Sequence, residues 1–158
     1  MKPRLGTLLI AMTCVLGLAA CQKTKVDLGE DILSQMVDIQ EETMEDFYDT
    51  VKDNSDICNK CLRDVRALVD SAEGRMRGLA GQWSQLKANT SIKDQRDAVN
   101  RVTPAMNEMY QKLEGMEEGA YKIFEEFQSN CPDQTPEVYG TMKRAAGLFQ
   151  KIIGSEFM

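Results

Sequence analysis

The chain has 158 residues, a net charge of −6 and no histidine. An acidic chain is a poor candidate for binding nucleic acid, because phosphates require Lys and Arg. The lack of histidine removes the commonest general base and the commonest metal ligand. The chain has only four prolines, and its later part is rich in residues that favour helices. We therefore expect an all-α fold without a cofactor.

The first 20 residues have the pattern of a secretory signal peptide that is removed from the mature protein. Lys2 and Arg4 form a basic start, residues 5–18 are almost wholly apolar, and the small residues Ala19 and Ala20 follow. Such a sequence of features is typical of secretory signals. The apolar run is too short to span a bilayer, which requires roughly 20 residues.

The segment Leu18-Ala19-Ala20-Cys21 resembles the lipobox of bacterial lipoproteins. The resemblance implies that Cys21 becomes the mature N-terminus and carries a diacylglycerol thioether and an N-linked acyl chain such as palmitate. Several acyl chains anchor a protein stably, at about 0.8 kcal/mol per buried CH₂. Gln22, not Asp, follows the cysteine, so the resemblance implies the outer membrane of the cell envelope, facing the periplasm. A plain secretory signal with a chance cysteine is the alternative.

A short membrane tether, residues 21–26, leads into a first predicted helix over residues 27–53. Its apolar residues recur at helical spacing and define one buried face: Leu28, Ile32, Met36, Ile39, Phe47 and Val51. The opposite face holds most of the ten acidic residues between positions 27 and 53. This face is either simply solvated or a docking face for a basic partner protein, with Glu41, Glu42, Glu45 and Asp49 as binding candidates.

A second helix is predicted over residues 56–87, after a turn in which Ser55 is a candidate N-cap. Its core-facing positions form parallel rows seven residues apart, which include Val65, Ala72 and Leu79, and Val69, Met76 and Trp83. Three glycines, Gly74, Gly78 and Gly81, weaken this helix. They indicate either the close approach of a neighbouring helix or a bend.

A third helix is predicted over residues 92–129, with the most regular apolar seam of the chain: Val99, Val102, Met106, Met109, Leu113, Met116, Ala120, Ile123 and Phe127. The seam keeps its phase across Pro104, which favours a kink over a fresh helix start. Thr135 and Pro136 begin a fourth helix that we expect to end near Gly154. Four amphipathic helices with short links predict one domain, residues 27–158, folded as an up-down-up-down antiparallel four-helix bundle.

Three cysteines remain once Cys14 leaves with the signal and Cys21 is acylated. Antiparallel packing brings Cys131, after the third helix, near Cys58 and Cys61 at the start of the second. We expect a Cys58–Cys131 disulfide, with Cys61 as the alternative partner, in the oxidising compartment to which the signal directs the chain. The third helix overshoots by about ten residues, or roughly 15 Å, which its kink must absorb.

Other chemistry has weaker support in the sequence. The Cys58-Asn59-Lys60-Cys61 segment resembles the thioredoxin redox motif but lacks the preceding strand. Covalent haem is excluded because Leu62 follows the motif, and zinc lacks a fourth ligand. Met106, Met109 and Met116 suit a soft metal such as Cu(I), yet they lie on the predicted core seam.

The sequence therefore predicts a non-enzymatic, membrane-anchored lipoprotein that acts through protein–protein interaction, of the assembly, pilot or exclusion type. The alternative is a thiol-redox or small-ligand-binding module that uses Cys58 and Cys61 or the bundle interior.

Overall fold

The computed structural model describes residues 23–153, so the predicted signal peptide and the acylation candidate Cys21 lie outside the described residues. The described chain contains the helices α2 (Lys25–Asp53), α3 (Cys58–Ala88), α4 (Ile92–Asn130), α5 (Thr135–Ala146) and α6 (Leu148–Ile153). No strand occurs among residues 23–153, and the predicted all-α fold is confirmed.

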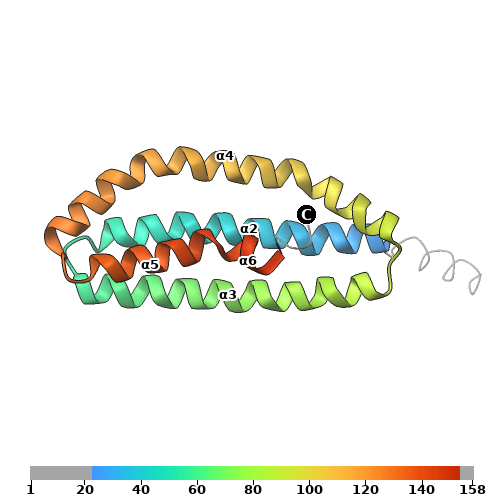
Figure 1. The fold of residues 1–158 in the computed structure, drawn as a ribbon, viewed down its shortest axis with the longest axis horizontal. Helices are drawn as coiled ribbons and strands as arrows, with labels where there is room; N and C mark the ends of the chain where they lie inside the picture. The colour runs from blue at the N-terminus through green and yellow to red at the C-terminus, as the bar shows by residue number, and fades with distance from the viewer. Residues whose placement is uncertain (1–22, 154–158) are drawn as a thin grey trace, which may run out of the picture.

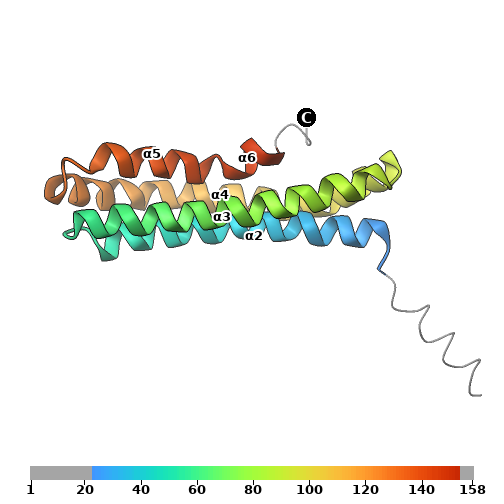
Figure 2. The same cartoon turned by 90° about the horizontal axis from the view of Figure 1, so that it is seen from below.

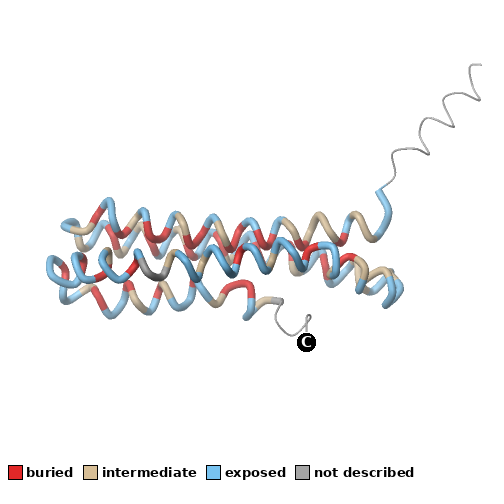
Figure 3. Tube along the Cα trace, turned by 90° about the horizontal axis from the view of Figure 1, so that it is seen from above, coloured by how far each residue is buried: buried red, intermediate tan, exposed pale blue. Residues whose placement is uncertain are grey.

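The three long helices lie side by side along one axis, with α2 packed against both α3 and α4 (Figure 1). Helices α5 and α6 return along α2 and α3 and end partway along the molecule (Figures 1 and 2). Buried positions recur along the inward sides of the helices, whereas the outward sides are exposed (Figure 3). The largest fully buried side chains come from every long helix and include Phe47, Met76, Met109 and Phe127.

Helix α2 begins two residues earlier than predicted, which shortens the expected tether. Thr24 is its N-cap: the Thr24 hydroxyl accepts a hydrogen bond from the Asp27 N–H, and the Asp27 carboxylate accepts one from the Thr24 N–H. This capping box satisfies two backbone donors at the helix end. The predicted buried face is correct at Met36, Ile39, Phe47 and Val51, whereas Ile32 is half-buried and Leu28 is 40% exposed.

Helix α3 begins at Cys58, two residues later than predicted. Ser55 was expected to cap this helix, but its hydroxyl donates to the carboxylate of Glu126 in α4 across 2.9 Å. Ile57 occupies the N-cap position without a side-chain cap. The tertiary contact to α4 therefore overrides the local capping signal.

Helix α4 continues through Pro104 as one element of 39 residues, against 31 in α3. Figure 1 shows α4 as an arc beside the straighter α3. The sequence predicted a kink that would absorb the extra residues. The curved path takes them up, and the end of α4 returns to the start of α3, where Cys131 lies 5.3 Å from Cys58 between Cα atoms.

The fourth helix was predicted as a single element, and this is wrong. The chain breaks at Gly147 into α5 and α6, so residues 23–153 form five helices instead of four. Glycine alone does not explain the break, because Gly147 has a right-handed conformation. The buried side chain of Gln40 in α2 hydrogen-bonds to backbone groups on both sides of it.

Candidate functional site

The structure joins Cys58, the first residue of α3, to Cys131, the residue that follows α4. Their sulfur atoms lie 2.02 Å apart and their Cα atoms 5.3 Å apart, as in a disulfide. The bond closes a loop across a sequence separation of 73 residues. In the chain-entropy model, such a crosslink stabilises the folded state by about 4 kcal/mol.

Cys61 remains a free and fully buried thiol. Burial, followed by the negative charge of Asp64, raises the pKa of Cys61 to about 11. A thiol with this pKa stays protonated at neutral pH and is a weak nucleophile. Since Cys58 pairs with Cys131 and not with Cys61, the arrangement favours a structural role for the Cys58–Cys61 segment.

The acidic candidates on α2 are partly paired within the molecule. Lys112 of α4 forms ion pairs with both Glu41 and Glu45, and these contacts raise the pKa of Lys112. Arg75 of α3 lies 3.2 Å from the carboxylate of Glu42. Asp49 is exposed and has no ion pair with any residue of the described chain.

A groove runs between α2 and α3, beside these acidic residues. It has a volume of about 380 Å³, and its lining consists of Gln35, Asp38, Ile39, Gly74, Arg75, Gly78, Leu79 and Gln82. An adjoining hollow of about 200 Å³ is lined by Asp38, Glu41, Glu42 and Glu45. Asp38 borders both hollows, which we together call the α2–α3 groove.

No helix of the described chain packs closely against the three glycines of α3. A Cβ atom added at Gly74, Gly78 or Gly81 would meet no atom within 4 Å. Gly74 and Gly78 instead form an open floor in the α2–α3 groove. Close approach occurs at Gly29 of α2, where an added Cβ would lie 2.9 Å from Ala98 and from Trp83.

Burial and nearby acids raise the pKa of one further carboxyl of α2. Partial burial, and then the charges of Glu42, Asp49 and Glu45, raise the pKa of Asp46. A cationic group that approached α2 here would relieve this repulsion. The acidic residues along this part of α2 therefore repel one another.

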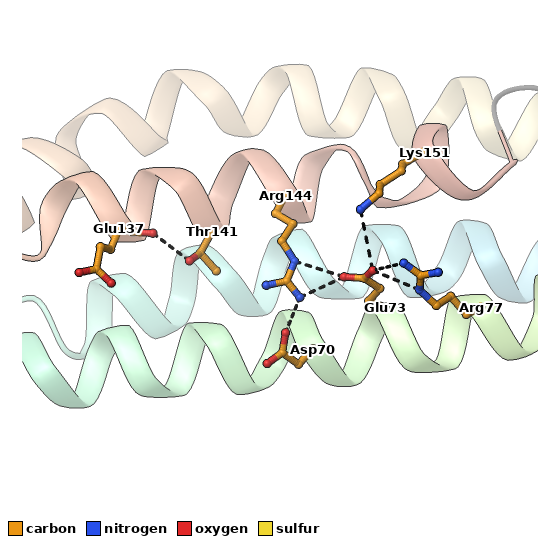
Figure 4. A network of polar contacts seen from close by, with 7 residues as sticks. All are labelled: Asp70, Glu73, Arg77, Glu137, Thr141, Arg144 and Lys151. Carbon is orange, nitrogen blue, oxygen red and sulfur yellow. Dashed lines mark hydrogen bonds and ion pairs between the residues drawn. The ribbon is translucent and has the colours of Figure 1, made fainter.

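On the side of α3 away from the α2–α3 groove, a network of ion pairs joins α3 to α5 and α6 (Figure 4). Glu73, whose side chain is 15% exposed, accepts hydrogen bonds from Arg77 at 2.6 Å and from Arg144 of α5 at 3.0 Å. Lys151 of α6 lies 3.9 Å away, and Arg144 also contacts Asp70. Hydrogen bonds from Arg77 and then Arg144 lower the pKa of Glu73. This network fastens α5 and α6 onto α3.

The methionine candidates for a soft metal belong to the core. Met109 is fully buried, and Met106 and Met116 pack against the same apolar cluster. Within residues 23–153, no three Cys, Asp or Glu side chains gather as a metal site would require. None of the helices described is both long and apolar enough to cross a bilayer.

Two features of the α2–α3 groove were not predicted from the sequence. Asp38 was not among the predicted binding residues, although it lies one helical turn before Glu42 and shares its face. The glycines that form the floor, Gly74 and Gly78, were noted in the sequence, but the sequence did not show which side of α3 they face.

In comparisons with protein-family models, curated proteins and solved structures, the chain matches none.

Proposed function

We propose that this protein is a lipid-anchored, non-enzymatic adaptor of the bacterial cell envelope that binds a partner protein in the α2–α3 groove. The resemblance of residues 18–21 to a lipobox supports the anchor on Cys21. The short connections between α2, α3, α4 and α5 support an up-down-up-down four-helix bundle, in which α6 extends the fourth helix. The outer membrane, facing the periplasm, is the proposed location.

The open floor of the α2–α3 groove carries the proposal of partner binding. Gly74 and Gly78 each cost the helix about 1 kcal/mol relative to Ala, and no neighbour in the described chain uses the space that they leave. Asp38, at the edge of the floor, has no ion pair with any residue between positions 23 and 153. A protruding side chain on a basic partner helix fits a small-residue floor with an acidic border.

The partner is identified by native mass spectrometry of the complex extracted gently from its own membrane. The spectrum reports the acyl mass on Cys21, the loss of two hydrogens at the disulfide, and any bound subunit. A triacylated chain that carries a protein subunit is the expected result. A lone chain that carries a metal or a small molecule would overturn the adaptor function.

The location of binding is tested by charge reversal at Asp38 and Asp49 together. Both carboxylates lack ion pairs within the described chain, so Asp38→Lys with Asp49→Lys leaves the internal contacts of Glu41, Glu42 and Glu45 intact. We expect this double variant to lose the subunit. Glu108→Lys with Glu114→Lys is the control of equal charge on the exposed side of α4, and it should retain the subunit.

A further inference from the structure

The end of the molecule where α2 begins also carries the loop between α3 and α4 (Figure 1). The ammonium group of Lys25 donates a hydrogen bond to the backbone carbonyl of Asn89, which joins the start of α2 to this loop. The side chain of Gln95 donates to the carbonyl oxygens of Lys87 at 3.1 Å and of Thr90 at 2.8 Å. These contacts join residues 87–96, which we call the α3–α4 tip, to one another and to the start of α2.

The α3–α4 tip presents an apolar side chain next to two cations. Ile92 begins α4 and is 75% exposed, the highest exposure among the large hydrophobic side chains of the described chain. Lys93 and Arg96 are exposed as well. Residues three and four positions apart share a helix face, so the side chain of Arg96 lies beside both Lys93 and Ile92 at the start of α4.

The two cations of the tip are not neutralised by the chain itself. Neither Lys93 nor Arg96 forms an ion pair with any residue from 23 to 153. Acidic residues at the start of α2 form ion pairs with other cations: Asp27 and Glu30 pair with Arg101, and Asp31 pairs with Lys23. Asp94 accepts a hydrogen bond from the Ser91 hydroxyl. Asp97, four residues after Lys93, is half-buried and forms no ion pair with Lys93.

We propose that the α3–α4 tip rests on an anionic phospholipid surface, with Ile92 in the interface and with Lys93 and Arg96 against the phosphates. The inference rests on the proposed lipid anchor. Cys21 precedes Lys23 by two residues, a reach of about 7 Å, so acyl chains on Cys21 hold this end of the molecule at the bilayer. Lysine and arginine near an anionic leaflet then strengthen the contact.

This contact gives the adaptor a defined orientation. An attachment at Cys21 alone leaves the direction of the long axis free, whereas the attachment and the tip together form two points that hold the long axis away from the membrane. Helix α2 has 29 residues, so its far end stands roughly 40 Å above the bilayer. The α2–α3 groove then faces sideways between the membrane and the Cys58–Cys131 bond, where a partner in the periplasm reaches it.

The test uses the full acylated protein in vesicles that contain phosphatidylglycerol and lipids with brominated acyl chains. Bromine quenches an indole only where the indole enters the bilayer, and the natural Trp83 is buried in the protein core. We expect Ile92→Trp to add emission that brominated lipids quench at least twofold. Ile57→Trp, at the exposed position 57 of the opposite end, is the matched control and should add emission that is not quenched.

A second pair of variants tests the charges. Lys93→Glu with Arg96→Glu, placed in the Ile92→Trp protein, should reduce the quenched population on the order of fivefold for each cation lost. Lys122→Glu with Lys143→Glu makes the same charge change away from the tip and should have no effect. Equal quenching at positions 92 and 57 in a chain with intact acyl mass on Cys21 would overturn the tip contact and leave the anchor standing. A chain without that mass would overturn the anchor and the tip contact together.

Discussion

The side-chain oxygen of Gln40 in α2 accepts a hydrogen bond from the backbone N–H of Phe149 across 3.0 Å. The side-chain nitrogen of Gln40 donates to the carbonyl oxygen of Ala145, also across 3.0 Å. In an uninterrupted helix these two backbone groups would bond to each other, because they lie four residues apart. The Gln40 carboxamide stands between them and separates α5 from α6. The break allows two consecutive side chains, Leu148 and Phe149, to be buried.

The first prediction concerns this inserted side chain. Gln40→Ala removes one hydrogen-bond partner from Ala145 and one from Phe149, and it leaves a cavity in the core. Each buried backbone group that loses a partner costs about 1–3 kcal/mol, so we expect the free energy of unfolding to fall by about 3 kcal/mol. Urea unfolding measures this change.

Gln35→Ala is the matched control for Gln40→Ala. Gln35 also lies on α2 and donates to a backbone carbonyl, that of Asp31, but it is exposed. An exposed substitution of this kind changes stability by about 0.5 kcal/mol or less. Equal effects of the two substitutions would contradict a structural role for the inserted amide.

The helical seams could be predicted from the sequence, whereas the α5–α6 break could not. Periodic spacing placed Val102, Met109 and Phe127 on the buried face of α4, because a helix must bury one apolar stripe. Antiparallel packing then brought Cys131 to the start of α3. Gln40, however, is a polar residue whose partners lie 105 and 109 residues further along the chain. No local sequence pattern predicts such a contact. The hydrogen bond from Ser55 to Glu126 could not be predicted for the same reason, because its partners are 71 residues apart.

The second prediction compares alanine substitutions at two glycines. Gly29→Ala places a Cβ atom 2.9 Å from Ala98 and Trp83, and overpacking of this kind costs about 1–3 kcal/mol. Gly78→Ala meets nothing within 4 Å and should raise the free energy of unfolding by about 1 kcal/mol. The same Gly78→Ala variant partly fills the α2–α3 groove, so we expect it to weaken partner binding while it stabilises the fold. Thermal unfolding and native mass spectrometry report the two effects separately.

The third prediction concerns the buried thiol. With a pKa of about 11, Cys61 is about one part in a thousand thiolate at pH 8, so iodoacetamide should alkylate it at least about a hundredfold more slowly than an exposed cysteine. The rate should rise about tenfold per pH unit up to pH 10. The folded state holds this proton more tightly than the unfolded state, so the free energy of unfolding falls as the pH rises from 9.0 to about 11. Rapid alkylation of the folded, oxidised protein at pH 7 would favour the thiol-redox function instead.

The fourth prediction concerns the network that fastens α5 and α6 to α3. Because the folded state lowers the pKa of Glu73, its contribution to stability is present above the ordinary value of 4.5 and is lost as the pH falls through the lowered pKa. Glu73→Gln removes the titrating charge, so a plot of unfolding free energy against pH between 5 and 3 should become shallower. Glu114→Gln, which removes an exposed carboxylate of α4 outside this network, is the matched control.

Hydrogen exchange shows whether the same network holds α5 in place. Arg144 would keep only Asp70 as a carboxylate partner in the Glu73→Gln protein, and Lys151 would lose its contact with α3. We expect faster exchange of the backbone amides of α5 and α6, while the amides of α2 and α4 retain their rates. Uniformly faster exchange in all the helices would mean that Glu73 stabilises the whole fold and does not fasten α5 and α6 in particular.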